Sequence, residues 1–135
     1  MANKDESGRD ERAMKAMREV LMQRVLSGII LDAQLRLPDW RRRRRVSWPI
    51  DVWVLYRDSE AKDIGWLYDK FLADLRDAGV RPDDVKLMFQ PLAPDEATEP
   101  SMAARASRMG TLSLKEIDAD ERRREARENV RRYGG

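Results

Sequence analysis

The stretch that decides the fold covers residues 58–89 and reads DSEAKDIGWLYDKFLADLRDAGVRPDDVKLMF. Its apolar side chains recur at intervals of three and four, as they do along one face of an α-helix. Ser59 can cap the start of this helix, Gly79 can close it, and Pro82 prevents its continuation. The pattern therefore predicts an amphipathic helix whose buried face consists of Ile64, Leu67, Phe71, Leu75 and Ala78.

Strand patterns flank this helix on both sides. Residues 46–57 and residues 85–89 alternate along the chain with the period of a β-strand. The first of these segments also carries Trp53 and Leu55 on its second face, which is typical of a strand inside a sheet. The sequence thus predicts a β-α-β unit over residues 46–90, with its two strands as near neighbours, in a domain of the α/β (α+β) class.

The N-terminal part of the chain predicts a second, longer helix. Residues 1–10, MANKDESGRD, are polar and are expected to be disordered. Residues 11–37 carry a broad apolar stripe that ends at Pro38, and burial of this stripe against the sheet is the favoured interpretation. The methionines within it leave open an adaptable surface for a partner protein.

The C-terminal part is dominated by charge. An acidic, proline-rich segment, QPLAPDEATEP, is expected to be a linker, and a short helix over residues 101–109 is closed by Gly110. A further helix is predicted from Ser113 to Tyr133, and its few apolar residues indicate an exposed helix. The alternative is a basic arm that becomes ordered on DNA or on a protein partner. The chain is thus divided into a disordered N-terminus (1–10), an α/β domain (11–92) and an acidic linker with an arginine-rich helical tail (93–135).

Composition restricts the chemistry that the chain can perform. Its 135 residues suffice for one domain, and 27 basic residues nearly balance 25 acidic ones, so any basic face must be local. The absence of cysteine excludes disulfides and thiolate metal sites, and the absence of histidine removes the commonest general base. No apolar run approaches the roughly 20 residues that span a bilayer, and the N-terminus lacks a signal-peptide pattern. The protein is therefore expected to be soluble and cytoplasmic.

A run of arginines before the first predicted strand is the candidate nucleic-acid site. It consists of Arg41, Arg42, Arg43, Arg44 and Arg45. One interpretation is an arm that contacts phosphates, with Trp40 and Trp48 available to stack on unpaired bases. The other is a solvated basic loop whose tryptophans anchor it to the core.

The stretch KDIGWLYDKFLADLRDAGVRPDDVKL, residues 62–87, resembles the core of the RusA-type Holliday junction resolvases. The family signature reads basic–Asp–x–Asp–Asn–x–x–Lys, followed by an apolar helix, then Ala–Gly, then Asp–Asp and a strand. Asp63 matches the first aspartate, Ala78–Gly79 match the turn, and Asp83–Asp84 match the acidic pair. Upstream, WPIDVWVLY is similar to the strand that precedes the signature.

The resemblance implies a magnesium-dependent endodeoxyribonuclease that cuts branched DNA as a homodimer in recombination and repair. The catalytic residues would be Asp63 and Asp84, and Asp83 would join them as a ligand of Mg²⁺. Lys62 and Lys70 would contact DNA together with the arginine run.

The chain departs from the signature at three positions. Gly65 stands in place of the second aspartate, Trp66 in place of the asparagine and Asp69 in place of the lysine. A glycine supplies no side-chain oxygen to Mg²⁺, which requires several hard oxygen ligands. The resulting prediction is a DNA-binding RusA-like protein with catalysis undecided. The alternative is a non-enzymatic protein-interaction or assembly module of a phage or mobile element, with a possible partner on the C-terminal helix.

The acidic site can form only if the chain brings Asp84 back to Asp63. A helix from Asp63 to Asp77 would rise about 21 Å, so Asp84 returns to Asp63 only if residues 78–84 double back almost straight. The alternative is a twofold dimer in which Asp63 of one copy faces Asp83–Asp84 of the other.

Overall fold

The predicted β-α-β unit forms the centre of the fold in a computed structural model of the chain. The structure describes the backbone of residues 2–133 and the side chains of residues 8–62 and 64–132. Strand β2 (Ile50–Arg57) pairs in parallel with β3 (Val85–Leu92), in a register that runs from Ile50↔Val85 to Arg57↔Leu92. The connection passes through the 3-10 helix η1 (Asp58–Asp63), helix α3 (Gly65–Asp77) and the 3-10 helix η2 (Pro82–Asp84). The prediction of two neighbouring strands around a helix is confirmed.

The start of α3 differs from the prediction. Ser59 lies within η1, and the α-helix begins six residues later at Gly65, with Ile64 as its N-cap and no side-chain cap hydrogen bond. Ile64 is buried, so the tighter 3-10 turn brings its side chain onto the core before the α-helix starts. The end of the helix is as predicted, because Gly79 adopts the left-handed conformation with φ of 92°.

The prediction of one helix up to Leu37 was wrong. Helix α1 (Ala2–Leu26) ends before Gly28, whose φ of 79° is left-handed, and residues 32–35 form strand β1 (Asp32–Leu35). This strand pairs antiparallel with β2, from Asp32↔Leu55 to Leu35↔Val52. Its residues fit a helical stripe and a strand alternation equally well, and pairing with β2 decides between them. At its other end α1 begins at Ala2, so the backbone of residues 2–10 is helical rather than disordered.

The C-terminal third belongs to the same sheet and core. Helix α4 (Glu99–Met109) begins at the N-cap Thr98 and ends at Gly110, and strand β4 (Leu112–Ser113) pairs antiparallel with β1. Helix α5 (Leu114–Tyr133) follows directly, close to the predicted bounds. The strand order is β3-β2-β1-β4, which gives an α+β fold with a four-stranded mixed sheet. Residues 93–133 thus contribute two helices and a strand to the same fold.

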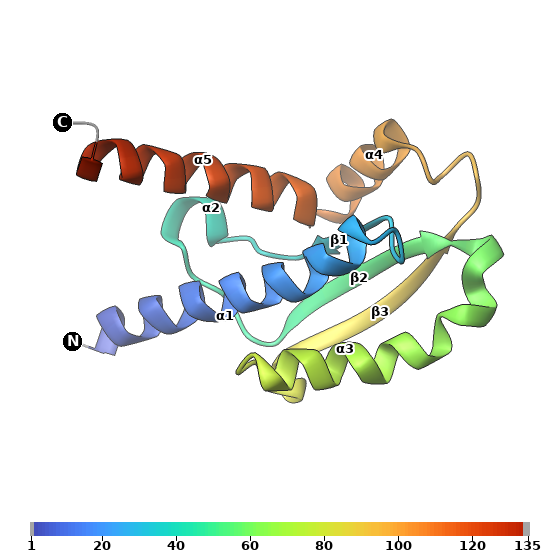
Figure 1. Cartoon of the computed structure of the whole chain (residues 1–135), viewed down its shortest axis with the longest axis horizontal. Helices are drawn as coiled ribbons and strands as arrows, with labels where there is room; N and C mark the ends of the chain where they lie inside the picture. Colours follow the sequence, from blue (N-terminus) through green and yellow to red (C-terminus); the bar gives the residue numbers. More distant parts are fainter. Residues whose placement is uncertain (1, 134–135) are drawn as a thin grey trace.

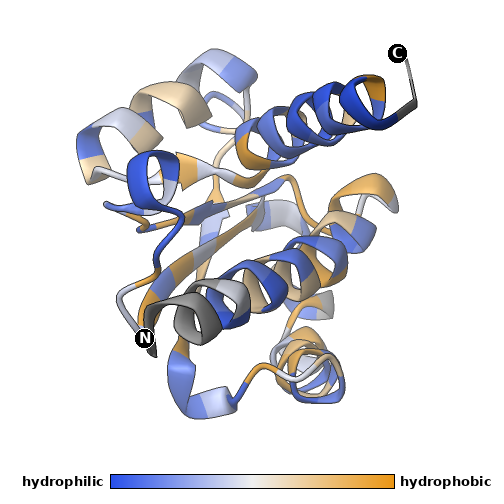
Figure 2. Ribbon diagram, turned by 90° about the vertical axis from the view of Figure 1, so that its left-hand side faces the viewer, coloured by the Kyte–Doolittle hydropathy of each residue, from blue (hydrophilic) through white to orange (hydrophobic). Residues whose placement is uncertain are grey.

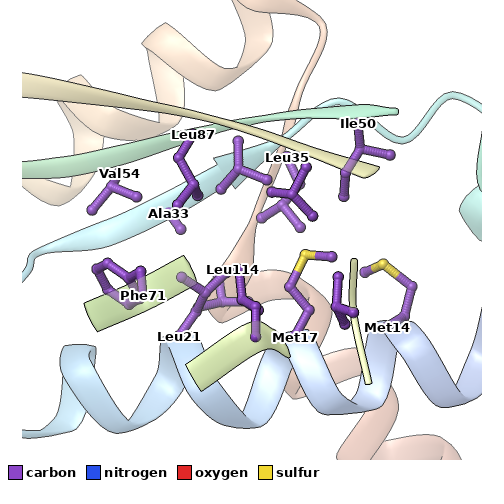
Figure 3. Packing of buried hydrophobic residues seen from close by; sticks show 14 of the residues in the cluster. Met14, Met17, Leu21, Ala33, Leu35, Ile50, Val54, Phe71, Leu87 and Leu114 are labelled. Atoms are coloured by element: carbon purple, nitrogen blue, oxygen red, sulfur yellow. The ribbon is translucent and has the colours of Figure 1, made fainter. Parts of the chain in front are cut away.

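The helices cover the sheet unequally. Helices α1 and α3 lie on one face, where Met14, Met17 and Leu21 of α1 meet Phe71 of α3 and the first turn of α5 (Figure 3). On the opposite face, α4 covers a smaller cluster around Leu55, Leu92 and Met102. The N-terminal half of α1 and the C-terminal half of α5 extend past the sheet on the same side, with the short helix α2 (Trp40–Arg43) between them (Figure 1). None of the helices in the described part of the chain has the length and apolarity needed to cross a membrane.

Two glycines test the observed bounds of α3. A Cβ added at Gly65 would meet no atom within 4 Å, and the φ of Gly65 is not left-handed, whereas that of Gly79 is. Gly65→Ala should raise the free energy of unfolding by about 0.4–1 kcal/mol, because alanine reduces the entropy of the unfolded chain. Gly79→Ala should lower it by about 1–2 kcal/mol, the cost of a left-handed alanine. Urea denaturation of both variants measures the difference, and equal effects of the two substitutions would contradict the observed helix bounds.

Candidate nucleic-acid interface

The arginine run is held on the core by its first aromatic neighbour. Trp40, the first residue of α2, is 3% exposed, and the guanidinium of Arg44 lies 4.2 Å from the centroid of its ring. Arg44 also ends α2 in a left-handed conformation, with φ of 55°. Trp40 is thus an anchor, as in the second interpretation of the sequence, and its ring is not available to a nucleic-acid base.

Ion pairs dock α5 beside this segment. The largely buried side chain of Arg18 on α1 lies 3.5 Å from Asp118, 4.0 Å from Glu121 and 3.2 Å from Glu125. Arg44 donates a hydrogen bond of 2.5 Å to the carboxylate of the same Glu121. Glu121 therefore joins α1, α2 and α5 at one point.

Two further arginines of the run also meet carboxylates. Arg41 lies 3.3 Å from Glu116 and 3.7 Å from Asp120, and all three side chains are exposed. Arg45 lies 3.7 Å from the buried Asp10. Arg42 and Arg43 are exposed, and neither forms an ion pair within residues 8–62 and 64–132. The run is thus divided between holding the fold and facing solvent.

The docked helix separates its charges only in part. At 100° per residue, Arg123, Arg127 and Arg131 fall within about 80° of one another, while Glu121 lies about 160° from Arg123. The carboxylates that bind Arg18 therefore point away from Arg123, Arg127 and Arg131. The α2 side of the helix keeps two acids, because Glu116 and Asp120 pair with Arg41 and Asp120 also pairs with Arg123. Figure 2 shows that α5 is hydrophilic along most of its length beyond the first turn.

Between α2 and α5 lies a groove of about 430 Å³, which we call the arginine groove. Six arginines line it against two carboxylates, those of Asp120 and Glu121. The arginines come from both helices: Arg41, Arg42, Arg44, Arg123, Arg124 and Arg127. Each guanidinium presents several N–H groups in a planar fork that matches the oxygens of a phosphate. The groove is therefore suited to phosphate groups.

A second groove, of about 350 Å³, lies on the other side of α5, against α1. It shares Trp40, Arg44 and Arg124 with the arginine groove, so the two grooves are neighbours. Its charges nearly cancel, because five basic side chains face four carboxylates. The positive charge is thus concentrated in the arginine groove.

A buried carboxyl group holds the residue that precedes the N-terminal end of α5. Asp32 on β1 is 2% exposed and accepts hydrogen bonds from the backbone N–H of Ala33, at 2.8 Å, and from the hydroxyl of Ser113 on β4. Burial raises the pKa of Asp32 above its ordinary value, and these hydrogen bonds and the nearby Lys115 offset only part of that effect. The contact links the sheet to the residue that immediately precedes α5.

The acidic residues of the family signature are not brought together within one chain. Asp63 ends η1 beyond the C-terminal end of β2, and Asp83 and Asp84 precede the N-terminal end of β3. Because β2 and β3 are parallel, these positions lie at opposite ends of α3, whose 13 residues span about 20 Å. The side chain of Asp63 lies outside the described residues. Asp83 is exposed, and Asp84 lies 3.6 Å from Arg81.

The side chains that the structure describes do not form a magnesium site within one chain. No group of three or more acidic, histidine or cysteine side chains that could hold a metal occurs in the part of the chain whose side chains are described. The Cβ of an aspartate at position 65 would meet no atom within 4 Å, so the fold has space for the carboxylate that the sequence lacks there.

The two lysines predicted to contact DNA lie apart from the arginine groove. Lys62 is exposed in η1, at the end of β2 opposite to α2, and Lys70 is exposed on α3. Instead, three arginines that were not predicted as DNA contacts line the arginine groove: Arg123, Arg124 and Arg127. Their spacing along α5 is visible in the sequence, but their proximity to α2 is not.

Comparison of the chain with protein-family models, with curated proteins and with solved structures found no match.

The buried Asp32 predicts a specific pH dependence. The pKa of Asp32 is higher in the folded protein than in the unfolded chain, where it is near 3.8. The stabilisation from neutral Asp32 is therefore complete below the pKa of the unfolded chain, and it is lost as the pH rises through the pKa of the folded protein. Asp32→Asn stays neutral, with its carbonyl oxygen accepting from the N–H of Ala33 and its NH2 group donating to the hydroxyl oxygen of Ser113. It should therefore raise the free energy of unfolding at pH 7 and have little effect at pH 3. Urea denaturation at both pH values measures this. The exposed Asp69→Asn is the control, and a destabilised Asp32→Asn protein at pH 7 would contradict the account.

Proposed function

We propose that the chain binds the phosphate backbone of DNA through the arginine groove and does so without hydrolysing it. The observation that carries this proposal is the convergence of six arginines from α2 and α5 on one groove. The protein as a whole has a formal net charge of only +2, so the attraction to a polyanion is concentrated in this region. The resemblance to RusA-type resolvases supports DNA as the ligand and branched DNA as its preferred form.

Three of the groove arginines are the best candidates for direct contacts. Arg42, Arg124 and Arg127 are exposed, and none of them forms an ion pair with another described side chain. Binding to phosphate would therefore not require them to give up an internal partner. Arg41 would have to exchange Glu116 and Asp120 for phosphate, and Arg44 is committed to Glu121 and Trp40.

The proposal leaves hydrolysis out because the carboxylates are separated. A magnesium site would require a homodimer in which Asp63 of one copy faces Asp84 of the other. The nuclease activity implied by the resemblance would require this dimer, because only the dimer would bring the two carboxylates together. It predicts that Mg²⁺-dependent cleavage of a four-way junction is lost in Asp84→Asn, whereas our proposal predicts no cleavage by the unmodified protein.

A protein-interaction module is the second candidate. Trp66 on α3 is 53% exposed and Tyr68 is 43% exposed, although the ring of Tyr68 packs 5.9 Å from that of Phe89. Exposed aromatic side chains are enriched at protein interfaces. Binding through this surface would depend little on salt, in contrast to binding through the arginine groove.

Removal of three groove arginines tests the proposal. The triple variant Arg42→Ala, Arg124→Ala, Arg127→Ala should bind a labelled four-way junction and a linear duplex at least about tenfold more weakly, since each hydrogen bond to a charged group contributes roughly 1.5–3 kcal/mol. The slope of log affinity against log salt should fall by about one for each lost contact, because fewer counterions are released. Fluorescence anisotropy between 50 and 300 mM salt measures both quantities.

A matched variant separates a local site from net charge. Arg57→Ala, Arg76→Ala, Arg108→Ala removes the same charge from exposed arginines outside the arginine groove. It should retain the wild-type salt slope. Equal losses in the two triple variants would show that binding follows net charge and would contradict the proposed site.

A further inference from the structure

A third groove, of about 280 Å³, lies where the N-terminal half of α1, residues 46–49 and the turn between α3 and β3 meet. We call it the Trp48 groove. Its polar and aromatic lining consists of Arg9, Arg12, Trp48, Arg81 and Asp84. Its volume is close to the lower limit of ligand pockets, about 300 Å³, which suits one small unit rather than a folded partner.

The indole of Trp48 is held as a rigid wall of this groove. Its Nε1–H donates a hydrogen bond of 2.9 Å to one carboxylate oxygen of Asp10. The other oxygen of Asp10 accepts a hydrogen bond of 2.9 Å from the backbone N–H of Val46, and Asp10 itself is 6% exposed. A fixed aromatic wall loses little conformational entropy when a planar ligand packs against it.

The charge of the groove is positive. Three guanidinium groups face one carboxylate, that of Asp84, which lies 3.6 Å from Arg81. Arg9 and Arg12 are exposed and have no acidic partner among the side chains that the structure describes. An aromatic wall beside exposed guanidiniums has the two features that recognise a nucleotide, a base surface and a phosphate site.

The Trp48 groove is linked to the arginine groove only through residues that line the groove between α1 and α5. Arg12 lines both the Trp48 groove and the groove between α1 and α5, and Arg44 and Arg124 link that second groove to the arginine groove. All three lie at the end of the molecule where α1 and α5 extend past the sheet, on the left in Figure 1. A strand lying in this path would meet positive charge at both ends.

We propose that the Trp48 groove holds one nucleotide of single-stranded nucleic acid, with its base against Trp48 and its phosphate on Arg9, Arg12 and Arg81. The proposal rests on the proposed function, since it extends the phosphate path of the arginine groove. It adds a preference that the arginine groove does not have. A base stacked and paired within a duplex cannot enter a groove of this size, whereas an unpaired base can.

The indole N–H resonances of the intact protein test the proposal without altering Trp48. The chain has four tryptophans, and Trp→Phe substitutions assign their signals in ¹H–¹⁵N spectra. Titration with the oligonucleotide (dT)12 should shift the Trp48 signal through the ring current of a stacked base. The signal of Trp66 should stay in place. Trp66 is the internal control, because its exposed ring is the first that an unspecific stacking ligand would reach.

An affinity measurement supplies the second test. Arg9→Ala, Arg12→Ala should weaken (dT)12 binding about tenfold, in the range expected for loss of one bound nucleotide. Duplex affinity should change less than twofold. Arg57→Ala, outside the grooves, should leave both affinities unchanged.

Three outcomes would overturn the proposal. They are a stationary Trp48 signal at saturation, a shift of Trp66 instead, and binding of free dTMP as tight as that of (dT)12, which would indicate a site for free nucleotides. Its failure is distinguishable from failure of the proposed function. A stationary Trp48 with intact, arginine-groove-dependent duplex binding removes only the nucleotide subsite, whereas loss of all nucleic-acid binding by the unmodified protein removes both proposals.

Discussion

The docking of α5 by the ion pairs of Glu121 with Arg18 and Arg44 is the interaction on which the rest of this structure depends. Only two described side chains of α5, Leu114 and Ile117, are buried in the hydrophobic core. Burial of one such side chain stabilises by about 1.5–3 kcal/mol, which fixes the first turn of the helix but not the direction of the remaining turns. From Asp118 onward, that direction is set by carboxylates that meet arginines of α1 and α2. The arrangement explains how a helix with so few apolar residues lies beside the domain.

The same ion pairs produce the positive surface. Because the carboxylates that bind Arg18 face α1, Arg123 and Arg127 lie on another side of α5 and line one groove with the arginines of α2. The near balance of charge in the sequence is thus divided only in part. Acids of α5 bind the largely buried Arg18 or the exposed Arg41, while Arg124 and Arg127 have no acidic partner among the described side chains. Arg44 and Arg45 support this division from within the run, while Arg42 and Arg43 face solvent. The proposed DNA contact is a consequence of the way in which the helix is attached.

Local patterns in the sequence predicted the centre of the fold and missed its connections. The β-α-β unit was predictable because strand alternation, helical periodicity and the Gly79 turn all agree over residues 46–90. Strand β1 was missed because residues 32–35 satisfy both periods, and only pairing with β2 distinguishes them. The attachment of α5 was missed because Arg18–Glu125 joins residues 107 positions apart, which no local pattern records. For the acidic residues, Asp63 and Asp84 flank one helix in sequence, and a parallel β-α-β unit necessarily places such positions at opposite ends.

The distance between α5 and the rest of the domain is the most direct test of whether ion pairs dock this helix. The chain has no cysteine, so spin labels at Ser47→Cys and Val130→Cys, both exposed positions, report one distance by pulsed electron paramagnetic resonance. Docking by ion pairs predicts a single narrow distance distribution at 50 mM salt. It also predicts a broad distribution after Glu121→Gln, which removes the negative charge that Arg18 and Arg44 share. A distribution that stays narrow after this substitution, or one that is already broad in the unmodified helix at low salt, would contradict the account.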